Sequence, residues 1–147
     1  MNLQLKANTY SEITDKNLLE LVQIAINKKE VSINCYKLLL AKECSGQNRS
    51  MINEIIADEI KHQRALKSIY FNACKKHAVI ETMETYVKSE YIAANKDMLF
   101  SEITGMEIFK SLYQMIKSAT IRDILFDIIT DDQIHSGKLS LIIFSAL

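Results

Sequence analysis

The chain has 147 residues, long enough to bury a substantial core within one domain. Its 18 basic and 18 acidic residues give a net charge of zero, without a basic block or stripe, which argues against a nucleic-acid partner. Apolar residues make up 48% of the chain and charged residues 24%, as in ordinary globular domains, and no apolar run is long enough to span a membrane.

The N-terminal segment and the cysteines bear on the cellular location. The first residues, MNLQLKANTYSEITDK, lack the basic start and apolar run of a secretory signal peptide, so we expect a cytoplasmic protein. Cys35, Cys44 and Cys74 are isolated, and the absence of a Cys-x-x-Cys pair excludes a zinc ribbon or a rubredoxin-type iron site within this chain. We expect these cysteines to be reduced and to act as small apolar residues.

Amphipathic helices are predicted for most of the sequence. Proline is absent and only three glycines occur, so the two commonest helix breakers are nearly missing. Apolar residues recur every three or four positions in four segments, each about 40 Å long at ~1.5 Å per residue. The four predicted helices cover residues 14–43, 50–76, 89–117 and 120–145. We therefore predict one all-α domain over residues 1–147.

The connections between these segments predict their topology. Short connections, CSGQN around Gly46 and KSAT at residues 117–120, make the helices on either side antiparallel neighbours. The second and third helices are joined by HAVIETMETYVK, residues 77–88, which can run the length of a bundle at ~3.3 Å per residue. The prediction is a four-helix bundle made of two antiparallel helix hairpins joined by a long crossover.

Polar side chains interrupt the apolar face of every predicted helix. In helix order they are Lys29, Glu59 with His62, Glu102, and Asp132 with His135. An acid and a histidine three residues apart share one helix face, so they can offer an oxygen and a nitrogen to one metal ion. Lys29 and Glu59 are separated by 30 residues, as are Glu102 and Asp132, which places all four at matching heights. Buried carboxylates are costly, and a metal cluster is the usual way to compensate several of them.

Three motifs resemble those of the rubrerythrin-type di-iron proteins in the ferritin-like superfamily. They are DEIKH (58–62), FSEITGMEIF (100–109) and DDQIH (131–135), and the resemblance extends from about residue 14 to residue 145. It implies a ferritin-like bundle that holds two iron ions per chain, with manganese or zinc as alternatives. It further implies a separate electron-donor protein, because the chain has no rubredoxin module of its own.

The resemblance also implies a role for each polar residue. Glu59 and Asp132 would bridge the two ions, His62 and His135 would be terminal ligands, and Glu102 would be a further carboxylate ligand. Proteins of this type react their reduced iron pair with oxygen or peroxide, or they oxidise and store iron.

The first helix departs from the family pattern. The family has a glutamate seven residues before a tyrosine, but counting back from Tyr36 gives Lys29, and Glu30 is turned by ~100° around the helix. In one interpretation, Glu30 enters the site through a local bulge and completes the ligand set. In the other, the Lys29 ammonium replaces one metal charge and pairs with Glu59 and Glu102, leaving one metal or none. The sequence does not decide between them.

Two more positions differ from the rubrerythrin pattern. Asp132 stands in place of the usual glutamate, so its side chain is one methylene shorter. The additional third-helix carboxylate typical of rubrerythrins would fall near Gly105, which cannot supply it.

Three functional hypotheses follow from this pattern. The first is a rubrerythrin-like di-iron oxidoreductase that acts on peroxide or oxygen, or that oxidises iron. The second is a bundle with a degenerate metal site, Lys29 occupying a ligand position, that acts as a non-catalytic binding or assembly module. The third, iron storage, ranks last, since we expect no fifth helix to build a cage. The apolar segment LSLIIFSAL (139–147) indicates either packing on the bundle end or part of a homodimer interface.

Overall fold

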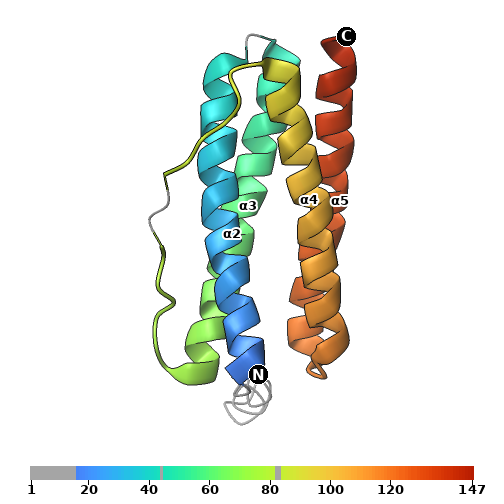
Figure 1. Cartoon of the computed structure of the whole chain (residues 1–147). Coiled ribbons are helices and arrows are strands. Elements are labelled where there is room, and N and C mark those ends of the chain that lie inside the picture. Colours follow the sequence, from blue (N-terminus) through green and yellow to red (C-terminus); the bar gives the residue numbers. More distant parts are fainter. Residues whose placement is uncertain (1–15, 44, 82–83) are drawn as a thin grey trace.

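Four long helices make up most of the described part of the chain. The computed structural model describes residues 16–43, 45–81 and 84–147, so the predicted helix start at residues 14–15 and Cys44 lie outside it. Within these ranges the helices are α2 (Lys16–Lys42), α3 (Gly46–Cys74), α4 (Tyr91–Met115) and α5 (Ala119–Ser145), and no strand occurs. The predicted all-α four-helix bundle is confirmed (Figure 1). None of these helices is sufficiently long and apolar to cross a membrane.

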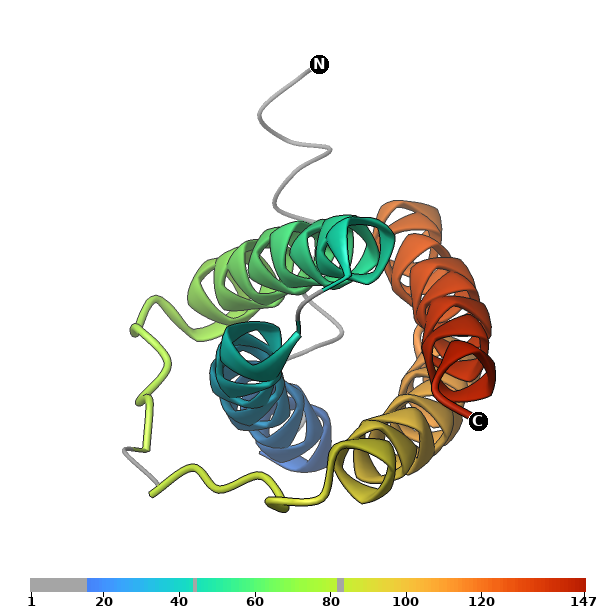
Figure 2. The same cartoon turned by 90° about the horizontal axis from the view of Figure 1, so that it is seen from above.

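Each helix runs antiparallel to the two helices that it contacts. Figure 1 shows α2 and α5 running in one direction and α3 and α4 in the other. α2 packs against α3 and α4, and α5 packs against α4 and α3. Figure 2, a view down the bundle, shows the four helices arranged in a ring. One face of every helix is therefore directed to a common centre, where side chains distant in sequence can meet.

The ends of the helices are set by local capping. α3 begins at Gly46, four residues before the predicted start at Ser50. The reason is Ser45, which is extended (φ −70°, ψ 128°) and whose hydroxyl accepts a hydrogen bond from the Asn48 backbone N–H, the usual geometry of a helix N-cap. Glu90 caps α4 with its carboxylate in the same manner.

The crossover between α3 and α4 lies along the outside of α2. Figure 1 shows this segment travelling from one end of the bundle to the other. Gln23 exchanges two hydrogen bonds with the backbone of Val79, at 2.7 and 3.2 Å, and Asn27 accepts one from the Glu81 N–H at 3.3 Å. Figure 2 shows that the crossover lies on the side of the ring away from α5. The outward side of α5 is therefore not covered by it.

Two apolar clusters fill the bundle and leave a polar layer between them. One cluster consists of Leu18, Val22, Ala25, Ile26, Leu66, Ile69, Phe109, Leu112, Ile116, Ile121, Leu125 and Ile128. The other consists of Cys35, Tyr36, Leu39, Ile52, Ile55, Ala94, Met98, Leu139 and Ile142. On every helix the polar residues singled out from the sequence fall between the members of these two clusters. The polar layer is thus closed off along the bundle axis by hydrocarbon on both sides.

Two cysteines lie within the described residues, and both have free thiols. Cys35 is buried in the second apolar cluster, whereas Cys74 is half-buried at the end of α3. Burial raises the pKa of the Cys35 thiol, which keeps it protonated, as expected for a small apolar residue.

Candidate metal centre

The polar layer contains six buried side chains contributed by all four helices. None of them is more than 4% exposed, and they are Lys29, Glu59, His62, Glu102, Asp132 and His135. Their burial follows from position, since a polar residue on the inward face of a helix has apolar neighbours one turn before and after it. Because charged groups are rarely buried without partners, the contacts within the layer determine whether it is tolerated.

The Lys29 ammonium binds two carboxylates at once. Its Nζ lies 2.7 Å from Oε1 of Glu59, and 3.0 and 3.3 Å from Oδ1 and Oδ2 of Asp132. The predicted contact with Glu59 is therefore present, but Asp132 takes the place of Glu102 as the second partner. Glu102 instead accepts a hydrogen bond from the Tyr36 hydroxyl. Lys29 thus joins α2 to α3 and to α5.

The two histidines are held by aspartates of the opposite motif. His62 Nε2 lies 2.8 Å from Oδ2 of Asp131, and His135 Nε2 lies 3.1 Å from Oδ2 of Asp58. When each Nε2 carries the proton and donates it to the aspartate, the Nδ1 lone pair of each ring is directed into the layer. Metal-binding histidines are commonly oriented by such a carboxylate. Neither aspartate was predicted from the sequence as a site residue, although each one directly precedes the acid of its own motif.

Both histidines face the carboxylates of Glu59 and Asp132. His62 Nδ1 lies 3.4 Å from Oε1 of Glu59 and 3.8 Å from Oδ1 of Asp132. The Lys29 ammonium binds these same two oxygens. The ring centre of His135 is 6.1 Å from that of His62.

His135 Nδ1 is buried and has no hydrogen-bond partner among the described residues. The nearest carboxylate oxygens are Oε2 of Glu102 at 3.6 Å, and Oε1 of Glu59 and Oδ1 of Asp132 at 3.8 Å. These separations exceed those of a good hydrogen bond. They suit a shared ion, because ligands at ~2.1 Å from a tetrahedral metal lie ~3.4 Å apart. One ligand atom from each of these four residues lies within 4.8 Å of the others, so the set fits a single ion.

Glu30 is not brought into this group. Its side chain is half-buried, and its Oε2 accepts a hydrogen bond of 2.6 Å from the Gln63 amide. The helix continues without interruption through Lys29 and Glu30, so the bulge that would turn Glu30 inward is not present.

Lys28 and Gly105 lie beside Asp132 at the edge of the polar layer. A Cβ atom built on Gly105 would lie 3.4 Å from Cε of Lys28 and 3.5 Å from Oδ2 of Asp132, both ordinary contacts. The Lys28 ammonium lies 3.4 Å from the Ser101 hydroxyl, and burial lowers its pKa. A second cation therefore flanks the layer on its α4 side.

The buried layer carries an excess of negative charge. Glu59, Glu102 and Asp132 contribute three negative charges against the one positive charge of Lys29, which leaves −2 when both histidines are neutral. Burial, aided by repulsion from Glu102 and Glu59, raises the pKa of Asp132 to about 6 against the attraction of Lys29. For Glu59, burial raises the pKa, but the neighbouring His62 and the Lys29 ammonium outweigh this effect and lower the pKa overall.

Three further groups, in the layer or in contact with it, hold their protons more tightly than usual. Burial lowers the pKa of Lys29, but attraction to Glu59, Asp132 and Glu102 outweighs this effect and raises it. Burial and the adjacent Glu102 raise the pKa of Tyr36 well above its ordinary value. Burial lowers the pKa of His135, whereas Glu102 and Asp58 raise it by a larger amount.

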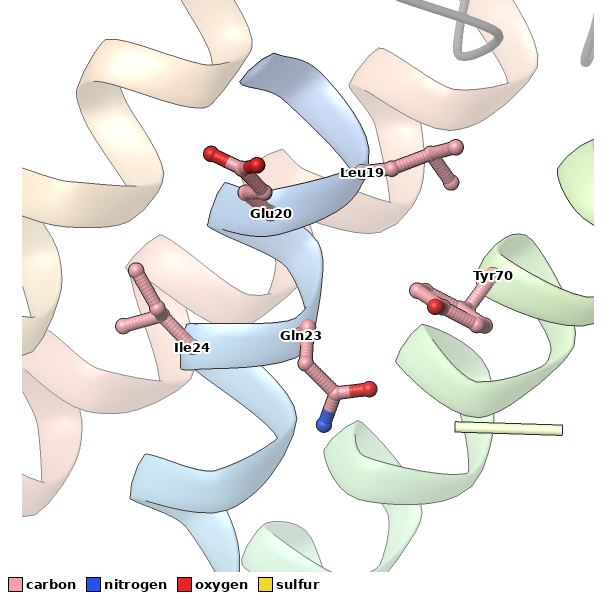
Figure 3. A pocket seen from close by; sticks show the side chains of 5 residues that line it. All are labelled: Leu19, Glu20, Gln23, Ile24 and Tyr70. Atoms are coloured by element: carbon pink, nitrogen blue, oxygen red, sulfur yellow. The ribbon is translucent and has the colours of Figure 1, made fainter. Parts of the chain in front are cut away.

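Two surface hollows among the described residues lie away from the polar layer. One, of about 510 Å³, lies between the N-terminal part of α2 and the end of α3 and is lined by Leu19, Glu20, Gln23, Ile24 and Tyr70. Figure 3 shows Leu19 and Gln23 on the side of α2 that faces Tyr70. A second, of about 320 Å³, lies beneath the crossover and includes Ser101, the partner of Lys28. The first shares no residue with the layer, so we do not place the site there.

Comparison with known proteins identifies a partial relative. The sequence is 34% identical over 70 residues to the Uncharacterized protein YhjR of Bacillus subtilis (strain 168), a match covering 48% of this chain and 48% of that protein. The chain thus spans about half the length of the curated relative that it matches. No family model matches the sequence. No solved structure matches it.

We predict that Lys29→Met strongly destabilises the metal-free protein. The substitution keeps the hydrocarbon of the side chain but leaves Glu59 and Asp132 buried without a cation, which typically costs about 3–5 kcal/mol. The free energy of unfolding at pH 7, measured by urea denaturation, should fall by that amount. Lys28→Met is the matched control, and it should change little, because burial already disfavours the charge of Lys28. Equal losses in both variants would contradict the role assigned to Lys29.

We also predict that the protein loses stability in alkaline solution. The pKa values of Lys29 and Tyr36 lie above their ordinary values of 10.5 and 10.0. Above pH 10 the unfolded chain therefore releases protons that the folded chain retains. The free energy of unfolding should then decrease with rising pH, by about 1.4 kcal/mol per pH unit for each group.

Urea denaturation between pH 8 and pH 11 measures this alkaline loss of stability. Tyr36→Phe should reduce the slope, because phenylalanine releases no proton in either state. Tyr86→Phe is the control, since Tyr86 is 75% exposed and its replacement should leave the slope unchanged. A slope that is the same in all three proteins would show that Tyr36 is not responsible.

Proposed function

We propose that this protein is a ferritin-like bundle that binds one divalent transition-metal ion, with iron as the expected ion, through Glu59, Glu102, Asp132 and His135. The observation that carries the proposal is His135 Nδ1, which is buried, unpartnered and within 3.6–3.8 Å of three carboxylate oxygens. Three carboxylates and one imidazole suit iron, manganese or zinc. The antiparallel packing of neighbouring helices and the long crossover support the ferritin-like part of the proposal.

The charge of the buried layer supports the same proposal. The layer is at −2 with neutral histidines, and a divalent ion would bring it to zero. Burial, aided by repulsion from Glu102 and Glu59, raises the pKa of Asp132 to about 6, and a bound cation would favour the charged carboxylate. Because binding requires a neutral His135, whose pKa is raised, the ion would compete with a proton and bind less tightly in acid.

Lys29 favours one ion over two. In the di-iron proteins that the sequence resembles, Glu59 and Asp132 would bridge a pair of ions. Here the Lys29 ammonium binds both carboxylates, at 2.7 and 3.0 Å, and supplies positive charge that a second ion would otherwise bring. A second divalent ion on these carboxylates would lie within a few ångströms of this ammonium, in a poorly screened interior where like charges repel strongly. The one-ion site is therefore the better fit to this chain.

The proposed activity is redox chemistry of the rubrerythrin type. A bound ferrous ion would supply one electron to dioxygen or peroxide, and the second electron that reduction of peroxide to water needs would come from a separate electron-donor protein. Asp58 would fix the tautomer of His135, and Tyr36 would orient the carboxylate of Glu102 through its hydrogen bond. The apolar clusters on both sides of the layer would exclude bulk water. A separate protein would return the electron, because the sequence has no cysteine pair for a second iron centre.

A second candidate function is a metal-free binding or assembly module. The hydrogen bonds of the layer favour it, since each buried carboxylate has a donor without any metal. The Lys29 ammonium donates to Glu59 and Asp132, and the Tyr36 hydroxyl donates to Glu102. In this case the polar layer would act only to fix the register of the helices.

Metal counting distinguishes these candidates. The protein is stripped with chelator, loaded anaerobically with ferrous iron and desalted, and its iron is measured by elemental analysis. We expect about one iron per chain in the unsubstituted protein and almost none in His135→Ala. Glu30→Ala should retain the iron, because Glu30 lies outside the ligand set. Two irons per chain that are lost in Glu30→Ala would instead support a di-iron site. A protein that binds no iron would support the metal-free module.

The Lys29→Glu variant tests why the site takes one ion. If Lys29 occupies the second position, this substitution should raise the iron content toward two per chain. Lys29→Gln is the matched control, which removes the charge without adding a ligand carboxylate, and should stay near one. Circular dichroism of both variants verifies that the helices are intact. Unchanged iron content in a folded Lys29→Glu protein would contradict the proposed position of Lys29.

A further inference from the structure

The outward side of α5 carries a continuous apolar line. Its four large members, Phe126, Ile134, Leu141 and Phe144, are 55, 54, 62 and 77% exposed. Thr130 and Gly137 fill the remaining positions, so that successive members are three or four residues apart and share one helix face. This α5 line lies opposite the buried face that carries Asp132 and His135. A helix that is apolar on both faces is typical of one that is buried on both.

No charged side chain lies on the α5 line between Phe126 and Phe144. Asp127 and Lys138 border it on one edge, and the Lys138 ammonium is drawn toward α3 by an ion pair of 2.6 Å with Glu54. The crossover lies on the far side of the ring, along α2 (Figure 2). Nothing within the described residues therefore covers the α5 line.

We propose that two copies of this chain associate through the α5 line, with the two α5 helices antiparallel about a twofold axis near residues 135–136. The pattern of the line is complementary to itself in this orientation. Phe126 meets the Phe144 end of the second copy, Thr130 meets its Leu141, and Ile134 meets its Gly137. Large side chains thus face small ones in the middle, and aromatic rings meet at both ends, as a self-complementary interface requires.

Gly137 is suited to the centre of this contact. A Cβ atom built on it would meet nothing within 4 Å, so neither the packing nor the backbone of this protomer requires glycine here. Glycine destabilises the interior of a helix relative to alanine. The absence of a side chain leaves space for Ile134 of the second copy and allows the two helix backbones to approach closely. The dimer accounts for a glycine that the isolated bundle does not need.

The exposed area is of the size that a dimer needs. At roughly 200 Å² for each fully exposed side chain of this size, the four large members leave on the order of 450–500 Å² of apolar surface. That is more than half of the ~800 Å² that each partner buries in an interface of standard size. The small and polar side chains along both edges of the line would supply the rest.

Electrostatics allows this association as well. The chain has no net charge, so two copies do not repel at long range. With the axis at residues 135–136, Asp127 lies level with Phe144 of the second copy, and Lys138 lies level with its Gln133. The arrangement therefore opposes no like charges across the interface.

The mass of the full chain in solution tests the proposal. Sedimentation equilibrium should give twice the chain mass of 16.8 kDa at micromolar concentration. Ile134→Glu should raise the dissociation constant of the dimer by more than about tenfold, because it buries a charge at the centre of the interface. Ile24→Glu is the matched control, since Ile24 on α2 is 53% exposed and lies off the α5 line. A monomeric unsubstituted protein, or equal dissociation by both variants, would overturn the proposal.

Disulfide trapping tests the antiparallel geometry. In this arrangement the two copies of residue 137 are offset by only about 5 Å along the helices, whereas the two copies of residue 144 are about 25 Å apart. Gly137→Cys should therefore form a covalent dimer with itself on mild oxidation, and Phe144→Cys should not. The unsubstituted chain, with its three native cysteines, gives the background. Trapping of both variants to the same extent would indicate parallel helices and overturn the proposed geometry.

Discussion

The contact of the Lys29 ammonium with Glu59 and Asp132 constrains the whole bundle. Removing a carboxylate or an ammonium from water costs several kcal/mol, and attraction recovers this cost only when the partners meet at short range. The three groups belong to α2, α3 and α5, so all three helices must take one register for the distances of 2.7 and 3.0 Å to occur together. Apolar packing alone would tolerate a helix slipped by one turn, whereas this contact would not.

The asymmetry of the polar layer follows from a single position. α3 and α5 contribute equivalent pairs, Glu59 with His62 and Asp132 with His135, and each histidine is held by an aspartate of the other helix. α4 contributes a carboxylate, Glu102, whereas α2 contributes an ammonium at the same height. The ammonium binds Glu59 and Asp132, whereas Nδ1 of His135 has no hydrogen-bond partner among the described residues. One divalent ion would balance the remaining negative charge of the layer, which is the physical reason for proposing one ion and not two.

α5 has two separate tasks in these proposals. Its inward face supplies a carboxylate and an imidazole to the polar layer, and its outward face carries the apolar line that would meet a second copy. The two faces are independent, because side chains on opposite sides of a helix do not touch. Metal binding and dimer formation can consequently be tested separately. A dimer would nevertheless hold α5 more firmly, which would favour a fixed position for Asp132 and His135.

The sequence by itself determined the four helices, their approximate limits and the residues of the polar layer. This was possible because helical periodicity is local, and the 30-residue spacings set equal heights without knowledge of the packing. Only the tertiary structure decided the partners. Lys29 binds Asp132 as its second partner, whereas Glu102 accepts a hydrogen bond from the Tyr36 hydroxyl. The roles of Asp58 and Asp131 were equally hidden, since each contacts a histidine on another helix, and such contacts depend on how the helices are rotated about their axes.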